Sequence, residues 1–184
     1  MENSVRDSFV PALKLLGYSI NTDNTEELDE AEAMLKEQRP MVQAYLLDSA
    51  RDEMIAENAA IALVYSGEAP YATEYNEDLA YLVPKEGSNV WVDSWAITKD
   101  CKNTENAEKF LNYLLEVEIS KISFEYNHYG TPNKKLAEIL PAKYTEDPAL
   151  FPPSDVLDNC EIFKSLDQGT QNYYSKLWKE IKLD

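Results

Sequence analysis

The chain has 184 residues, 44% of them apolar and 11% aromatic, which is enough to bury a sizeable core and excludes the disordered class of proteins. Its 34 acidic residues against 17 basic ones give a formal net charge of −17, which excludes nucleic acids and anionic membrane surfaces as natural partners and favours cations. No apolar run approaches the length of a membrane span.

The first forty residues predict two helices. Over 4–16 the apolar residues recur on one stripe, and Gly17 follows as a helix-ending residue. A second, acidic helix is predicted over 25–39 and is stopped by Pro40. The stripe of the first helix consists of Val5, Phe9, Ala12, Leu13 and Leu16.

Strand patterns follow between residues 42 and 97. Residues 60–65 form a continuous apolar run, which is typical of a strand buried on both faces of a parallel sheet. Strands are also predicted over 42–47, 79–83 and 90–97, with a short helix over 49–58. Strands interleaved with helices indicate an α/β fold.

After Thr98 the pattern becomes mostly helical. An amphipathic helix is predicted over 104–116, with an apolar stripe that includes Phe110 and Leu114. The composition change predicts an α/β lobe over 1–97 and a mostly helical segment over 98–184 that belongs to another lobe. Further helices are predicted over 119–127, 133–140, 154–165 and 170–181.

Residues that carry common catalytic or metal chemistry are scarce. His128 is the one histidine, so a histidine-based zinc site or a Ser-His-Asp triad has little to draw on. With five glycines there is no Gly-rich phosphate loop. Cys101 and Cys160 lack metal-type spacing and are either one disulfide or two thiols. We therefore expect no cofactor and no metal, and any enzymatic activity would have to use carboxylates.

The strand over 90–97 carries the most informative chemistry. Alternate side chains of a strand share one face at a spacing of about 6.5–7 Å. A Trp and an Asp at that spacing can hold an ammonium group between an indole face and a carboxylate, and the cation–π contact contributes about 0.5–2 kcal/mol. The side chains on that face are Trp91, Asp93, Trp95 and Ile97.

A second candidate is Tyr65, at the carboxyl end of the apolar strand, where open α/β sheets bind ligands. Both candidates have a structural alternative. Asp93 could bond to backbone or a local Lys with the two tryptophans in the core, and Tyr65 could be an ordinary ring at a core edge.

Five segments together resemble a family. In this order and spacing the sequence resembles the spermidine/putrescine-binding proteins of polyamine ABC importers, over about Ser4 to Lys182. The segments are Leu15-Leu16-Gly17-Tyr18-Ser19, Tyr65-Ser66-Gly67, Val83-Pro84-Lys85-Glu86-Gly87, Trp91-Val92-Asp93-Ser94-Trp95-Ala96-Ile97 and Tyr129-Gly130-Thr131-Pro132-Asn133.

The resemblance implies an α/β fold of the type II periplasmic-binding-protein kind, hinged between two lobes. Relatives are longer and begin with an export signal, so we expect this chain to be truncated and to hold the second lobe plus C-terminal helices of the first. The implied function is that of an extracytoplasmic receptor, which holds a polyamine between its lobes and delivers it to an ABC permease.

The resemblance also implies site residues. Trp91 corresponds to an aromatic wall, Asp93 to an amine anchor, and Tyr129 to a ligand-facing Tyr. Tyr65 falls where relatives often have Trp. In the first helix, Asp7 falls at an acidic ligand-binding position. Ser4 falls where an Asp can occur, and Phe163 aligns where some relatives offer a Gln.

Three other functions are compatible with the residues. A receptor of the same fold for an amino acid or iron is one, since Arg6 lies beside the expected site and could bind an α-carboxylate. A carbohydrate-active hydrolase using Asp93 and a second acid is another. A purely structural or partner-binding domain is the third. Exposed apolar stripes in a truncated chain would also favour self-association.

Overall fold

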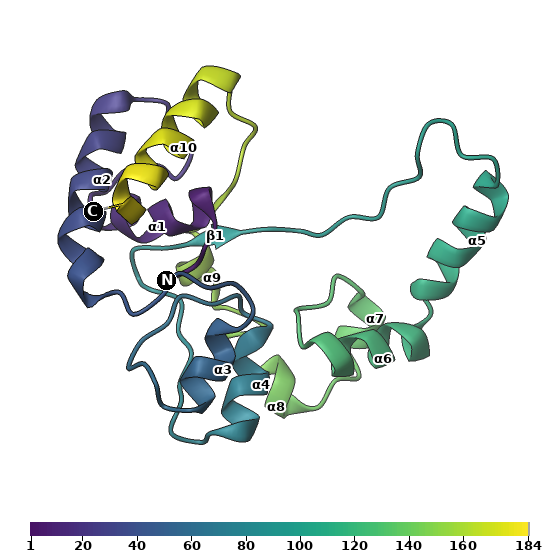
Figure 1. Cartoon of the computed structure of the whole chain (residues 1–184). Coiled ribbons are helices and arrows are strands. Elements are labelled where there is room, and N and C mark those ends of the chain that lie inside the picture. The colour runs from purple at the N-terminus through teal and green to yellow at the C-terminus, as the bar shows by residue number, and fades with distance from the viewer. Residues whose placement is uncertain (184) are drawn as a thin grey trace.

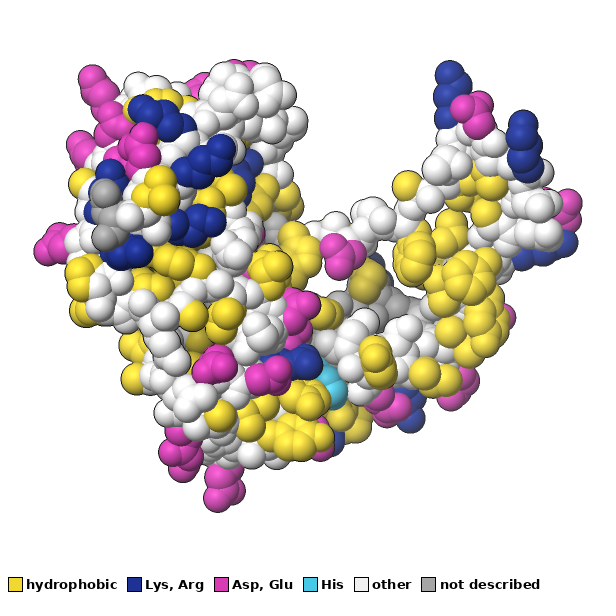
Figure 2. Space-filling view, viewed as in Figure 1, with side chains coloured by type: hydrophobic (Ala, Val, Ile, Leu, Met, Phe, Trp, Pro, Cys, Tyr) yellow, Lys and Arg dark blue, Asp and Glu magenta, His cyan; other side chains and the backbone are white. Residues whose placement is uncertain are grey.

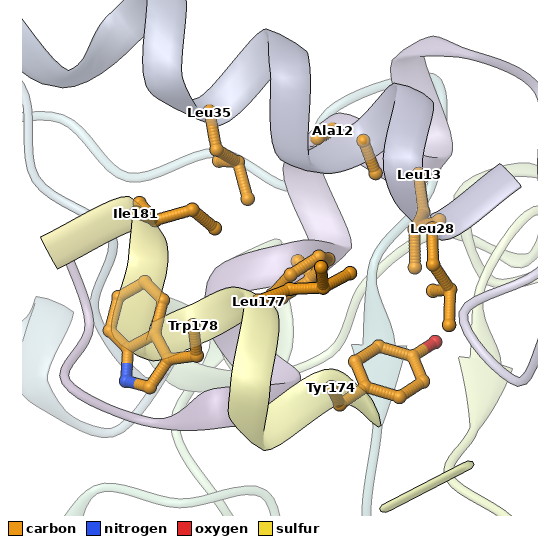
Figure 3. Close-up of a cluster of buried hydrophobic side chains, with 10 residues drawn as sticks. Ala12, Leu13, Leu28, Leu35, Tyr174, Leu177, Trp178 and Ile181 are labelled. Atoms are coloured by element: carbon orange, nitrogen blue, oxygen red, sulfur yellow. The ribbon is translucent and has the colours of Figure 1, made fainter. Parts of the chain in front are cut away.

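Helices from the two ends of the chain form the main core. The computed structural model describes residues 1–183, and in it α1 (Val5–Leu15), α2 (Thr25–Gln38) and α10 (Gln168–Leu183) lie together (Figure 1). The buried residues of α10 recur at helical spacing, so one face of that helix covers α1 and α2 (Figure 3). They are Tyr174, Leu177, Trp178 and Ile181.

This packing corrects part of the predicted division of the chain. The segment 98–184 was expected to belong to another lobe, but its last helix shares a core with α1 and α2. An apolar stripe shows which face of a helix is buried and does not name the element that covers it. The boundary near 97 stays a prediction for the residues between 98 and α10.

Two short helices form a second layer beneath this core. After η1 (Arg39–Met41), the helices α3 (Ala50–Ile55) and α4 (Glu68–Tyr75) pack side by side. Arg51 of α3 donates to the carboxylate of Glu68 in α4 at 2.6 Å, which ties the two helices together. The sequence reasoning did not predict α4.

The middle of the chain extends away from these helices as an arm (Figure 1). It contains α5 (Thr104–Leu114), α6 (Val117–Asn127) and α7 (Lys134–Ala137), and then α8 (Ala142–Thr145) and α9 (Ser154–Leu157) lead back. The sequence did not predict α8. A small separate core holds α6 and α7 together, and its buried residues are Phe124, Leu136, Leu140 and Leu150.

Strand pairing is confined to a few residues. β1 (Asn89–Val90) pairs in parallel with β2 (Glu161–Ile162), with Asn89 opposite Glu161. A single further bridge joins Glu2 and Leu46 in the described residues. None of the helices in residues 1–183 is long and apolar enough to cross a membrane.

Four of the predicted strands are therefore wrong for this chain. Residues 42–47, 60–65 and 79–83 form no named strand, and of 90–97 only Val90 is paired. Ile61, expected inside a sheet, is 88% exposed. A strand needs a hydrogen-bonded neighbour, and among residues 1–183 these segments find one only at Leu46 and Val90.

Candidate functional site

Three aromatic rings from distant parts of the chain meet at the end of β1. The ring of Trp91, directly after β1, lies 5.2 Å from that of Tyr65 and 6.0 Å from that of Tyr129, both edge to face. This is a favoured geometry for aromatic pairs. Each of the three was a predicted site residue. Trp95, by contrast, is 75% exposed and contacts Phe110 of α5.

A turn before α4 holds two of these rings. Tyr65 ends the irregular segment that precedes the turn, and Gly67 is the buried residue just before α4. The ring of Tyr129 lies directly on the backbone of Gly67. Tyr129 itself follows His128, whose positive φ ends α6 and turns the chain toward α4.

Asp7 brings a carboxylate to the same place from the first turn of α1. Its Oδ1 accepts a hydrogen bond from the side-chain amide of Asn89 at 2.9 Å, which links α1 to β1. Its Oδ2 accepts one from the hydroxyl of Ser4. The positive end of the helix dipole favours a negative charge there. Ser4, expected to face the ligand, thus orients Asp7.

The electrostatic surroundings of the two tyrosines are strongly negative. Burial first, and then the nearby carboxylates of Asp7 and Glu2, raise the pKa of Tyr65 to about 12. Burial likewise raises the pKa of Tyr129 to about 12, with a contribution from Glu68. The carboxylates that act on one or both rings are Glu2, Asp7, Asp48, Glu68 and Asp93.

Sequence reasoning named Asp7 and Asp93 and missed the other three. With 34 acidic residues, no local pattern separates Glu2, Asp48 or Glu68 from acids on the surface. Glu68 directly follows Ser66-Gly67 and is partly compensated by Arg51. Asp93 lies exposed on the extended segment after β1. Trp91 and Trp95 are also exposed, so the alternative that places both tryptophans in the core is not what is observed.

Glu161 of β2 fixes β1 to the α1 region. Its carboxylate accepts hydrogen bonds from Lys14 Nζ at 2.6 Å, Ser19 Oγ at 2.5 Å and the backbone N–H of Ile20 at 3.2 Å. Burial opposes its ionisation, but these bonds outweigh burial and lower the pKa of Glu161 to about 2. Because Ser88 accepts from the Glu161 N–H at 2.9 Å, this network holds the start of β1 in place.

Arg6 is engaged elsewhere. Its guanidinium donates to the carbonyls of Ile20 at 2.8 Å and Lys164 at 3.0 Å, and stacks 4.2 Å from the ring centre of Phe163. Both terminal nitrogens of Arg6, which was expected as a possible partner for an α-carboxylate, are therefore already bonded, and its Nε is buried. Phe163, which aligns where some relatives offer a Gln, thus covers Arg6.

Cys101 and Cys160, whose pairing the sequence left undecided, are free thiols.

The aromatic and acidic cluster extends from the surface, where Trp91 is 37% exposed, to the interior, where Glu2 is 2% exposed. A hollow of about 350 Å³ is lined by residues that include Thr73, His128 and Tyr144, and one of about 140 Å³ by residues that include Lys14 and Pro84. Neither includes a predicted site residue. In residues 1–183 no three His, Cys, Asp or Glu side chains are grouped to hold a metal ion.

Comparisons with known proteins identify the family of the chain. The family model of bacterial extracellular solute-binding proteins matches residues 1–152. The chain is 31% identical to the spermidine/putrescine-binding periplasmic protein of Salmonella typhimurium over 180 residues, and 30% identical to a putrescine-binding periplasmic protein of Pseudomonas aeruginosa over 177 residues. These alignments cover 96% and 93% of the chain but 52% and 48% of the relatives, so the chain spans about half of their length.

Solved structures show the same likeness. A Listeria monocytogenes protein superimposes with a TM-score of 0.89 at 38% identity. The spermidine/putrescine ABC transporter substrate-binding protein of Streptococcus pneumoniae does so with a TM-score of 0.88 at 34% identity. Each comparison covers 98% of this chain and 56% of the other. The fold is thus that of a part of a periplasmic solute-binding protein, and the chain belongs to the family of bacterial extracellular solute-binding proteins.

Proposed function

We propose that this chain forms part of an extracytoplasmic polyamine receptor of an ABC importer and has no catalytic step. The observation that carries the proposal is the contact of Tyr65, Trp91 and Tyr129 within a field of five carboxylates. Aromatic faces and carboxylates together suit an alkyl chain that carries ammonium groups, because the rings contact the methylenes and the acids pair with the charges.

The cluster has two acidic ends, which suits a ligand with at least two ammonium groups. Asp7 and Glu2 act on Tyr65, and Asp93 acts on Tyr129. Asp48 acts on both tyrosines, and Glu68 acts on Tyr129 and on Glu2. The ring of Trp91 contacts both tyrosine rings. We therefore assign Trp91 as the central aromatic wall. Asp7 and Asp93 are assigned as the amine anchors at the Tyr65 end and the Tyr129 end.

Segments on both sides of residue 97 contribute to the cluster, which suits a receptor that closes on its ligand. Tyr65 and Trp91 precede this position, and Tyr129 follows it. A ligand that contacts both segments favours the closed arrangement by the difference in its affinity for the two states. A closed, loaded receptor is the form that a membrane permease would recognise, and such a permease is the protein partner we propose.

Calorimetric titration of the chain with putrescine, spermidine, spermine and lysine tests the proposal. We expect saturable binding of at least one polyamine and none of lysine, because the carboxylates around Tyr65 and Tyr129 repel the carboxylate of lysine. Trp91→Ala and Asp93→Asn should each weaken polyamine binding about tenfold or more, as the loss of a cation–π or charged contact predicts. Trp95→Ala, at an exposed position on the same segment, is the matched control.

A receptor for an amino acid is the second candidate and makes the opposite prediction. Tight binding of lysine or another amino acid, together with no heat from any polyamine, would replace the proposed function with that one. Turnover of glycosides by the chain would instead point to a hydrolase.

A further inference from the structure

The side chain of Glu2 is buried and incompletely bonded. Glu2 is 2% exposed, and its Oε1 has no hydrogen-bond partner among the described residues. A buried carboxyl oxygen without a partner is costly, and such atoms are rare in folded proteins. An unbonded oxygen at this depth therefore calls for a specific explanation, and a bound cation is one.

The backbone on both sides of Glu2 fixes its position. Asn3 N–H donates to the Leu46 carbonyl at 2.8 Å, and Leu46 N–H donates to the Met1 carbonyl at 2.9 Å. The carbonyl of Glu2 itself accepts from Ser8 Oγ at 2.5 Å. Glu2 is thus held by a short parallel pairing and by α1, and its carboxyl has a defined place in the structure.

The charges around this carboxyl are mostly negative. Asp7 of α1, Asp48 before α3 and Glu68 of α4 all act on it, and the α-amino group of Met1 is the positive group that does so. Glu68 is paired with Arg51. The Glu2 carboxyl also acts on the phenol of Tyr65. Glu2 is therefore part of the acidic cluster next to the aromatic rings.

Resting on the polyamine-binding role proposed above, we infer that Glu2 is a further ligand contact. It receives an ammonium group of the polyamine beside Asp7 and Tyr65. Ammonium binding converts its carboxyl to the carboxylate, and the proton leaves to solvent. No bond other than this O–H bond breaks, and the ammonium keeps its own protons.

A pH dependence follows from this assignment. Burial, followed by repulsion from Asp7, Asp48 and Glu68, raises the pKa of Glu2 to about 7, while the Met1 amino group opposes the rise. An adjacent ammonium favours the carboxylate and lowers that pKa. Below pH 7 binding must therefore expel a proton, so affinity falls by up to about tenfold for each pH unit. Well above pH 7 the carboxyl is already ionised and this dependence disappears.

Spermidine titrations of the wild-type chain and of Glu2→Gln between pH 6 and pH 8.5 test the inference. Each titration is repeated in two buffers of different ionisation enthalpy, so that proton release is counted directly. For the wild type we expect affinity to rise with pH and protons to be released below pH 8. For Glu2→Gln we expect about tenfold weaker binding at pH 8.5, no release by this group and a flatter pH profile.

The Met1 amino group is the other titratable group that acts on Glu2, and its behaviour can be separated from that of Glu2. The Met1 amino group, whose pKa burial lowers, stays intact in Glu2→Gln, so any release that this variant loses belongs to Glu2. Asp93→Asn should bind more weakly yet keep the same pH profile.

The possible failures are distinguishable. If no polyamine binds the wild type at any pH, the proposed function is wrong and this inference falls with it. If the wild type binds and Asp93→Asn weakens binding, but Glu2→Gln matches the wild type in affinity and proton release, the role of Glu2 alone is refuted. A carbon-13 NMR titration of the Glu2 carboxyl in the wild type needs no variant. Its apparent pKa should fall when spermidine is added, and an unchanged value would overturn the inference.

Discussion

A Cβ atom added to Gly67 would lie 2.4 Å from Cζ and 2.5 Å from Cε2 of Tyr129. Carbon atoms that are not bonded approach no closer than about 3.5 Å without strain. The aromatic ring therefore needs a glycine beneath it, and the turn before α4 sets the position of a residue that follows α6. A residue without a side chain thus places one of the three rings of the site.

Gly67→Ala should displace the ring of Tyr129 and weaken polyamine binding about tenfold, which corresponds to about 1.4 kcal/mol. Calorimetry measures the affinity, and tyrosine NMR signals report the displacement. Ser66→Ala changes the neighbouring residue of the same turn and should bind as the wild type does. Equal affinity of Gly67→Ala and the wild type would mean that Tyr129 does not contact the ligand.

Glu161→Gln should destabilise the fold by about 1–3 kcal/mol near neutral pH, because it removes the ion pair with Lys14 and weakens the bonds from Ser19 and Ile20. The pKa of Glu161 is lowered from 4.5 to about 2 in the folded state, so its contribution is fully present above pH 4.5 and disappears as the pH falls toward 2. Urea unfolding at pH 7 and pH 3 measures the difference between variant and wild type. That difference should shrink at the lower pH, and one that stayed constant would contradict the assignment.

Glu2→Gln should stabilise the chain at high pH when no ligand is present. The pKa of Glu2 is raised from 4.5 to about 7 by folding, so its protonated form stabilises the fold below pH 4.5 and that stability is lost as the pH rises through 7. A neutral amide at this position removes the loss, which is about 1–3 kcal/mol. Thermal unfolding at pH 5 and pH 8.5 tests this. The unfolding temperature of Glu2→Gln should exceed that of the wild type only at pH 8.5.

Leu177→Ala should lower the free energy of unfolding by about 2–5 kcal/mol, because Leu177 is 2% exposed within the core shared by α1, α2 and α10. Leu115→Ala makes the same chemical change at a residue that is 64% exposed and should shift stability by less than about 0.5 kcal/mol. Chemical denaturation of both variants checks the pair. Similar losses in the two would mean that α10 does not pack as described.

We expect the exposed apolar face of α5 to drive self-association. No residue of α5 is buried, Phe110 is 54% exposed, and apolar side chains gather over α5 and α6 (Figure 2). Light scattering should show a mass that increases with concentration for the wild type, and a smaller increase for Phe110→Glu. Asn112→Glu adds the same charge to an exposed polar position of α5 and should associate as the wild type does. A monomeric wild type at all concentrations would disprove the expectation.

Helices and motif positions could be predicted from the sequence, and strand pairing could not. The stripe that begins at Val5 and the acidic run from Thr25 fold as α1 and α2, since helix formation depends on local spacing and its hydrogen bonds are internal. The apolar run over 60–65 has the composition of a buried strand. Pairing, however, depends on a neighbour that is distant in sequence, and Ile61 remains exposed without one.

The motifs marked three residues whose rings contact one another in the structure, Tyr65, Trp91 and Tyr129. Their role in ligand binding stays a prediction. Glu2 could not be found in the sequence, because its significance lies in its burial and in the acids around it, which only the folded chain brings together.

The shared core of α1, α2 and α10 has a consequence for how the chain folds. The α1–α2 pair can form from neighbouring residues, but docking of α10 closes a loop of about 130 residues. Closing such a loop costs conformational entropy before any contact of Trp178 or Ile181 forms. Contacts between residues so far apart in sequence slow folding. Until α10 arrives, the apolar faces of α1 and α2 stay open to solvent. Refolding of the first core should therefore wait for a segment at the opposite end of the chain, and the burial of Trp178 should be among the slowest events.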